Sequence, residues 1–235
     1  MIEISNLHKA FQKLKALDGI DLNWNKGEVI ALIGPNGSGK TTLLKCLLGL
    51  VFPNSGDIRL DKSSIINSYQ YRERIGYMSQ ISRFPDQLKV VELQEILTDI
   101  RKKNNAQLDL DLFHAFKIEL YKDKSLKTLS GGTRQKVNAA FAFMFDPEIL
   151  ILDEPTAGLD PISVEIFKEK IKSIPINKKY LIITSHILSD LEEITTRINY
   201  LQDGKVKFDL SMDQLIQKTG QNKLSKAIAQ FLSSN

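Results

Sequence analysis

The chain has 235 residues, a net charge of +4, 42% hydrophobic and 26% charged residues, and one cysteine, Cys46. This length suits one α/β domain with an inserted subdomain, and the composition is that of an ordinary soluble protein. No apolar run approaches the roughly 20 residues that span a bilayer, and residues 1–5 lack the pattern of a signal peptide. A single cysteine excludes a disulfide within the chain. We therefore expect a protein of a reducing cytoplasm that neither crosses nor enters a membrane.

Short strands and turns are expected in the N-terminal third, because apolar and polar residues alternate there between turn residues. The expected strands are residues 1–7, 19–23, 29–33, 56–60 and 74–79. A helix is expected after the third of these strands and should end near Leu48, and the fifth strand leads to Gln80.

The middle of the chain changes to helical spacing. Apolar residues recur every three or four positions over residues 90–104, and a second helical stretch covers residues 111–120. This insert interrupts an alternation of strands and helices that resumes further along the chain. The later helices are expected at 132–145, 162–173 and 188–197, the later strands at 149–152 and 180–184, a closing hairpin at 198–201 and 205–208, and two short helices after Met212.

A glycine-rich loop joins the apolar strand 29–33 to the helix that follows it. Its residues are Gly34, Pro35, Asn36, Gly37, Ser38, Gly39, Lys40 and Thr41, with Thr42 next on the helix. Glycines let backbone N–H groups approach a phosphate chain, and the start of a helix favours negative charge. Lys40 is expected to reach the β- and γ-phosphates and the Thr41 hydroxyl to ligate Mg²⁺. The sequence therefore predicts binding of a nucleoside triphosphate.

Two carboxylates follow the buried strand 149–152. Asp153 is expected to hold Mg²⁺ through its water shell, and Glu154 to polarise the water that attacks the γ-phosphate. Because a phosphate-binding loop lies upstream in the chain, the two carboxylates indicate hydrolysis of the bound nucleotide.

Ser130, Gly131 and Gly132 lie just before a predicted helix. They form either a capping serine with two turn glycines or a second anion site. One nucleotide bound to one chain would not need two phosphate-binding sites. Two copies arranged head to tail would use both, each nucleotide being held by the loop of one copy and the serine-glycine turn of the other.

In their order along the chain, these motifs resemble those of the ATP-binding subunits of ABC transporters, over about residues 1–210. The resemblance implies that Phe11 stacks on adenine and that Gln80 heads a loop touching Mg²⁺ and the membrane partner. It also implies that Asp160 belongs to the D-loop and that His186 donates a hydrogen bond to the γ-phosphate.

One residue departs from the pattern of the family. The signature motif, residues 129–132, is usually followed by glutamine, and here Thr133 follows it. The backbone of the serine and glycines supplies most phosphate contacts in this family, so we expect the two-copy ATP sandwich to survive. The departure concerns the hydrogen bonds that the glutamine makes in the sandwich.

The resemblance implies a P-loop NTPase (RecA-like) core of α/β class, with an N-terminal antiparallel β subdomain and an inserted α-helical subdomain. In this single ABC ATPase domain of residues 1–235, residues 1–80 and 146–210 would form the β subdomain and core, 81–145 the helical subdomain, and 211–235 a helical tail. The implied cofactors are ATP and Mg²⁺. The implied partners are a transmembrane permease and a second ATPase subunit, expected to be an identical copy, with no nucleic acid. The implied location is cytoplasmic, on the inner face of the cell membrane.

The type of transporter is a finer question. Residues 153–161 resemble ATPases that pair with ABC-2-type membrane subunits, while residues 76–85 and 129–137 are similar to the ATPase of nitrous oxide reductase maturation, which serves copper or sulfur species. One alternative is a non-transport ABC ATPase in a soluble assembly or in a ribosome- or nucleic-acid-associated complex. Another is a small-molecule kinase, but a kinase explains neither the serine-glycine turn nor Glu154.

Overall fold

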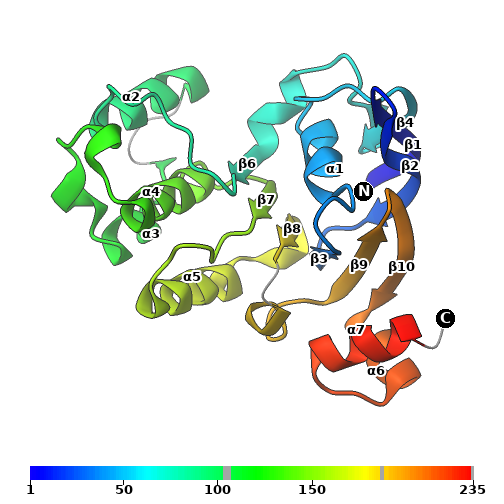
Figure 1. Ribbon diagram of the computed structural model, residues 1–235. Coiled ribbons are helices and arrows are strands. Elements are labelled where there is room, and N and C mark those ends of the chain that lie inside the picture. Colours follow the sequence, from blue (N-terminus) through cyan, green and yellow to red (C-terminus); the bar gives the residue numbers. More distant parts are fainter. Residues whose placement is uncertain (103–106, 186–187, 234–235) are drawn as a thin grey trace. The chain divides into compact units, whose positions relative to one another are not determined.

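The computed structural model describes residues 1–102, 107–185 and 188–233 and confirms the predicted α/β class (Figure 1). The chain divides into two compact units. Unit 1 consists of Met1–Arg72 and Ile176–Asn235, and unit 2 of Glu73–Pro175. A 3-10 helix, η1 (Gln70–Arg74), carries the chain from unit 1 into unit 2. None of the helices among the described residues combines the length and apolar character needed to cross a membrane.

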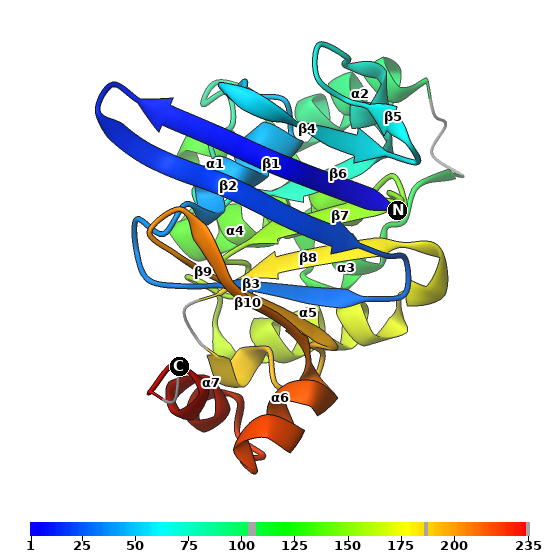
Figure 2. The same ribbon diagram turned by 90° about the vertical axis from the view of Figure 1, so that its right-hand side faces the viewer.

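Unit 1 begins with an antiparallel sheet of order β2-β1-β4-β5, the predicted N-terminal β subdomain (Figure 2). Its strands are β1 (Ile2–Phe11), β2 (Leu14–Trp24), β4 (Ser55–Leu60) and β5 (Ser63–Ser64). The predicted strands 1–7 and 19–23 are too short. Register shifts in the β1–β2 pair follow Ile4, Leu7 and Lys9, so the alternation of burial breaks before the hairpin ends.

The second sheet of unit 1 surrounds the strand that leads to the glycine-rich loop. This strand, β3 (Val29–Ile33), is parallel to β8 (Tyr180–Thr184) and β9 (Arg197–Gln202), and β10 (Lys205–Ser211) is antiparallel to β9. All residues of β3 and β8 are buried, as expected from the apolar sequence of β3 and from the apolar run that precedes Thr184 in β8. Helix α1 (Lys40–Leu47) follows β3, and the 3-10 helix η5 (Ile176–Lys178) precedes β8.

The helix predicted over residues 188–197 is wrong. Among the described residues, a short 3-10 helix, η6 (Leu188–Asp190), is followed by turns and then by β9. The Thr196 amide donates to the carbonyl of Val29 at 3.0 Å, and the Thr196 hydroxyl accepts from the Val29 amide at 2.9 Å. Hydrogen bonding and pairing with β3 therefore remove the end of this stretch, Thr196 and Arg197, from the predicted helix.

The predicted closing hairpin and the two C-terminal helices are confirmed. Arg197 of β9 donates to both carboxylate oxygens of Asp209 at 2.7 Å and to Glu28 at 2.9 Å, and these acceptors raise the pKa of its guanidinium. The helices are α6 (Met212–Thr219) and α7 (Leu224–Ser233). Phe231 of α7 packs edge-on against Phe208 of β10, with ring centroids 4.8 Å apart. The tail is thereby fixed to the hairpin.

Unit 2 contains a parallel strand pair, β6 (Ile75–Met78) and β7 (Ile149–Asp153), and the helix α4 (Gly131–Phe143). A Cβ on Gly76 would lie 2.1 Å from the carbonyl oxygen of Ala142, so α4 packs directly on the backbone of β6. The other elements are α2 (Val90–Arg101), α3 (Asp111–Ala115), η3 (Ile118–Tyr121), η4 (Leu126–Thr128) and α5 (Pro161–Ser173).

Two predicted helices of unit 2 end early. The stretch 111–120 is divided into α3 and η3, because Lys117 has a left-handed φ of 54°. Helix α2 ends at Arg101, and Lys102 follows with φ 50°. Residues 103–104 of that prediction lie outside the described residues. Left-handed backbone ends a helix, and an apolar periodicity does not reveal where it occurs.

Candidate nucleotide-binding site

The glycine-rich loop of unit 1 lies between β3 and α1, as predicted. Gly34, Gly37 and Gly39 have φ values of 151°, 79° and 107°. A Cβ on Gly34 would lie 2.0 Å from the carbonyl oxygen of Leu201, and one on Gly39 would lie 2.5 Å from that of Ala16. A Cβ on Gly37 would meet nothing within 4 Å. The absence of a side chain at Gly34 and Gly39 thus lets β9 and β2 pack against the loop. Gly37 is required only for its left-handed backbone conformation.

The loop curls around the ammonium group of Lys40, the first residue of α1. Its Nζ donates to the carbonyl oxygens of Gly34 at 2.7 Å and Pro35 at 3.0 Å, and the Ser38 hydroxyl lies 3.5 Å away. Lys40 and Ser38 are buried, whereas the outer residues of the loop are exposed. These exposed residues are Pro35, Asn36, Gly37 and Thr41. A buried cation beneath an open, glycine-lined backbone fits a phosphate chain.

The ring of Phe11 lies at the end of β1, beside the hairpin turn. It is 47% exposed, and the Lys9 ammonium lies 5.1 Å from its centroid. A half-exposed ring can stack on a base, because every base has a π-face. The adenine contact of Phe11 remains a prediction.

We expect Gly34→Ala to destabilise the protein by more than about 2 kcal/mol, because the new methyl group would overlap the Leu201 carbonyl in a left-handed backbone. The matched control is Gly37→Ala, which meets only the conformational cost of about 1 kcal/mol. Urea unfolding of both variants measures the difference. Equal losses would show that the contact with β9 does not require Gly34.

The two carboxylates lie in unit 2. Asp153 ends β7, Glu154 follows it, and both are buried, with exposed fractions of 4% and 6%. Glu154 has a φ of 53°, a left-handed conformation that costs a residue with a Cβ about 1 kcal/mol or more. The Ala157 amide donates to the Glu154 carbonyl at 3.1 Å and closes the turn. Burial, and then the charge of Asp153, raise the pKa of Tyr77 to about 12. The chain thus holds a buried carboxylate in a strained turn, where catalytic groups often lie.

The serine-glycine turn begins α4. Ser130 is the N-cap: its hydroxyl accepts from the Thr133 amide at 3.2 Å and lies 2.8 Å from the Thr133 hydroxyl. Ser130 is exposed, and a Cβ on Gly131 would meet nothing within 4 Å. The capping interpretation is therefore confirmed, and the exposed turn leaves room for the second one, which remains a prediction. Thr133 replaces the usual glutamine with a hydroxyl that contacts the hydroxyl of the signature serine.

Gln80 is exposed in the loop after β6, and two side chains of α4 anchor that loop. Asn138 donates from Nδ2 to the Ser79 carbonyl at 2.8 Å, and the Ser82 hydroxyl donates to Gln135 Oε1 at 2.6 Å. The sequence motifs do not identify Gln135 and Asn138. The feature that could have revealed them is a pair of polar residues, three positions apart, within the apolar face of a helix.

The remaining predicted residues are Thr42, Asp160 and His186. Thr42 is half-buried on α1, and Asp160 caps α5 by accepting from the Ser163 amide at 3.0 Å. His186 lies outside the described residues. Unit 1 thus gathers the residues of the glycine-rich loop, and unit 2 gathers the carboxylates, the signature turn and the D-loop.

A phosphate-binding loop between a buried parallel strand and a helix, in an α/β fold, defines a P-loop nucleotide-binding protein. The chain belongs to the ABC transporter family, whose model, described as ABC transporter, matches residues 17–157. It is an ATP-binding subunit and an ATPase of that family.

Relatives and solved structures agree with this assignment. The lantibiotic transport ATP-binding protein SrtF of Streptococcus pyogenes is 32% identical over 91% of this chain and 92% of its own. The uncharacterized ABC transporter ATP-binding protein YcbN of Bacillus subtilis is 30% identical over 94% of this chain and 72% of its own. A structure described as the ATP binding subunit of an ABC transporter matches with a TM-score of 0.89 at 24% identity, covering 97% of this chain and 98% of its own. At that identity, the structure supports the fold alone.

Proposed function

We propose that two copies of this chain close head to tail around two ATP molecules and thereby drive a separate transmembrane permease. The observation that carries the proposal is the exposed serine-glycine turn at the start of α4, which would serve as a phosphate-binding turn in addition to the glycine-rich loop. Each γ-phosphate would bind across two copies only in the closed state, and this difference in affinity supplies the conformational work. A solved cassette of similar fold, with a TM-score of 0.80, is itself described as dimeric.

Each site residue would have its own role in binding or hydrolysis of ATP. The backbone of the glycine-rich loop and Lys40 would bind the β- and γ-phosphates, Phe11 the adenine, and the turn at Ser130 the γ-phosphate held by the other copy. Glu154 would accept the proton of the attacking water, and His186 would orient that water. Thr41, Gln80 and Asp153 would hold Mg²⁺, which neutralises the charge of the phosphates. The D-loop residue Asp160 would lie near the nucleotide.

The domain division and the location of the chain belong to the same proposal. Residues 81–145 would act as the helical subdomain that transmits closure through the Gln80 loop to the permease, while residues 1–80 and 146–210 hold the nucleotide. The chain would then lie on the cytoplasmic face of the membrane, bound to its partner. For the transported system we propose one that serves nitrous oxide reductase maturation, which rests on the similarity of residues 76–85 and 129–137 alone.

The test is affinity purification of Glu154→Gln from detergent-solubilised native membranes with ATP present. A multi-spanning membrane protein recovered in a stoichiometric amount would support the transporter, and its identity would decide the transported system. Recovery of only soluble partners, ribosomes or nucleic acid would favour the non-transport ABC ATPase instead.

A further inference from the structure

An ion pair joins the signature helix to the residues before α5. Lys136, in the second turn of α4, places its Nζ 2.7 Å from Oδ2 of Asp160. The Lys136 side chain is only 24% exposed, and its ammonium lies 6.0 Å from the centroid of the Phe116 ring. Partial burial and a supporting aromatic ring hold this lysine in place more firmly than a fully solvated surface pair.

Asp160 is also bound on its other side. Its carboxylate accepts from the Ser163 amide at 3.0 Å and from the Ser163 hydroxyl at 2.8 Å. Lys136, and then Ser163, hold the pKa of Asp160 well below its usual range. One carboxylate thus connects the start of α5 to α4.

A second contact joins the same two segments. A Cβ on Gly132 of the signature would lie 3.0 Å from the carbonyl oxygen of Gly158. Two overlapping turns form the chain from Glu154 to Leu159, the residue before Asp160: the Ala157 amide donates to the Glu154 carbonyl and the Leu159 amide to the Thr156 carbonyl, both at 3.1 Å. The signature turn, the D-loop and Glu154 are therefore linked by short-range contacts within unit 2.

We propose that Lys136 is a positioning residue that couples the signature helix to Glu154 through Asp160. This inference rests on the proposed function. When the ATP of the other copy binds at Ser130–Gly132, α4 shifts, the ion pair carries Asp160 with it, and the closed turns pass the displacement to Glu154. Occupation of one site by the partner thereby aligns the base of this chain's own site.

The test compares four variants by ATP hydrolysis, ATP affinity, ATP-dependent dimerisation and thermal unfolding. Lys136→Met removes the ammonium but keeps the apolar stem, and Asp160→Asn removes the charge but keeps a capping side chain. We expect each to lower kcat about tenfold, to leave the KM for ATP and the dimer formed in the Glu154→Gln background unchanged, and to combine without a further loss. Lys136→Arg should recover most of the kcat.

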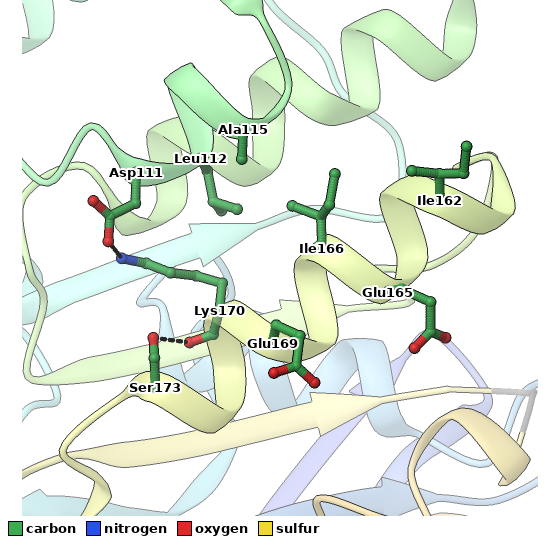
Figure 3. A pocket seen from close by; sticks show the side chains of 9 residues that line it. All are labelled: Asp111, Leu112, Ala115, Ile162, Glu165, Ile166, Glu169, Lys170 and Ser173. Carbon is green, nitrogen blue, oxygen red and sulfur yellow. Dashed lines mark hydrogen bonds and ion pairs between the residues drawn. The ribbon is translucent and has the colours of Figure 1, made fainter.

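Lys170→Met is the matched control. Lys170, near the C-terminal end of α5, forms ion pairs of 2.6 Å with Asp109 and 2.7 Å with Asp111. It lines a groove of about 610 Å³ between α3 and α5, where Figure 3 shows its pair with Asp111. Its loss should lower the unfolding temperature as much as that of Lys136 does, with wild-type kcat. A Lys136→Met enzyme with wild-type kcat, or an equal loss of kcat in Lys170→Met, would overturn the inference alone. A wild-type protein that neither hydrolyses ATP nor dimerises with it would overturn the proposed function as well.

Discussion

Replacement of Glu154 by glutamine is expected to lower the rate of ATP hydrolysis by more than about a hundredfold while ATP still binds. The amide has the shape of the carboxylate but cannot accept the proton of the attacking water. Glu154 is buried, with a left-handed φ of 53°. Glutamine has the same size and shape as glutamate, so this substitution is expected to preserve the turn. Phosphate release at saturating ATP measures the rate, and calorimetry measures the affinity.

The same variant tests the two-copy model. If ATP binds but is not hydrolysed, the ATP that bridges the two copies stays in place and the dimer persists. We expect Glu154→Gln to form a dimer in ATP and to remain a monomer in ADP, as measured by light scattering after gel filtration. Glu95→Gln, on an exposed position of α2, makes the same chemical change and should behave as wild type. A Glu154→Gln protein that stayed monomeric in saturating ATP would count heavily against the sandwich.

Replacement of Lys40 by methionine is expected to weaken ATP binding by about a hundredfold or more. The ammonium is buried among loop carbonyls, at 2.7 Å from Gly34 and 3.0 Å from Pro35, and it is the charge around which the loop curls. Without it, the phosphates lose charge-assisted hydrogen bonds, which contribute about 1.5–3 kcal/mol each. Titration with a fluorescent ATP analogue measures the affinity.

The control for Lys40 lies on the same helix. Lys45→Met, in the last turn of α1 at an exposed position, removes the same charge away from the loop and should leave the affinity within about twofold of wild type. If Lys40→Met bound ATP as tightly as Lys45→Met does, the glycine-rich loop would not be the phosphate site.

Local chemistry made much of this protein predictable. The loop at residues 34–41 is specified by its glycines and lysine, the strands β7 and β8 by short apolar runs that end in one polar residue, and the closing hairpin by its turn. In that turn Asp203 and Gly204 have φ values of 51° and 72°, the conformation that this residue pair favours. Each of these signals lies within a few residues, so no distant contact is needed to interpret it.

Contacts between distant residues decided the rest. The end of the predicted helix 188–197 is not helical because Thr196 and Arg197 bond or pair with β3, and β1 extends beyond its alternating pattern because β2 pairs with it through register shifts. A side chain at Gly34 would overlap the Leu201 carbonyl, and Lys136 forms an ion pair with Asp160, which is 24 residues further along the chain. A sequence pattern records what a residue does for its own helix or strand. Which distant backbone it meets depends on how the whole unit packs, and only the tertiary structure shows it.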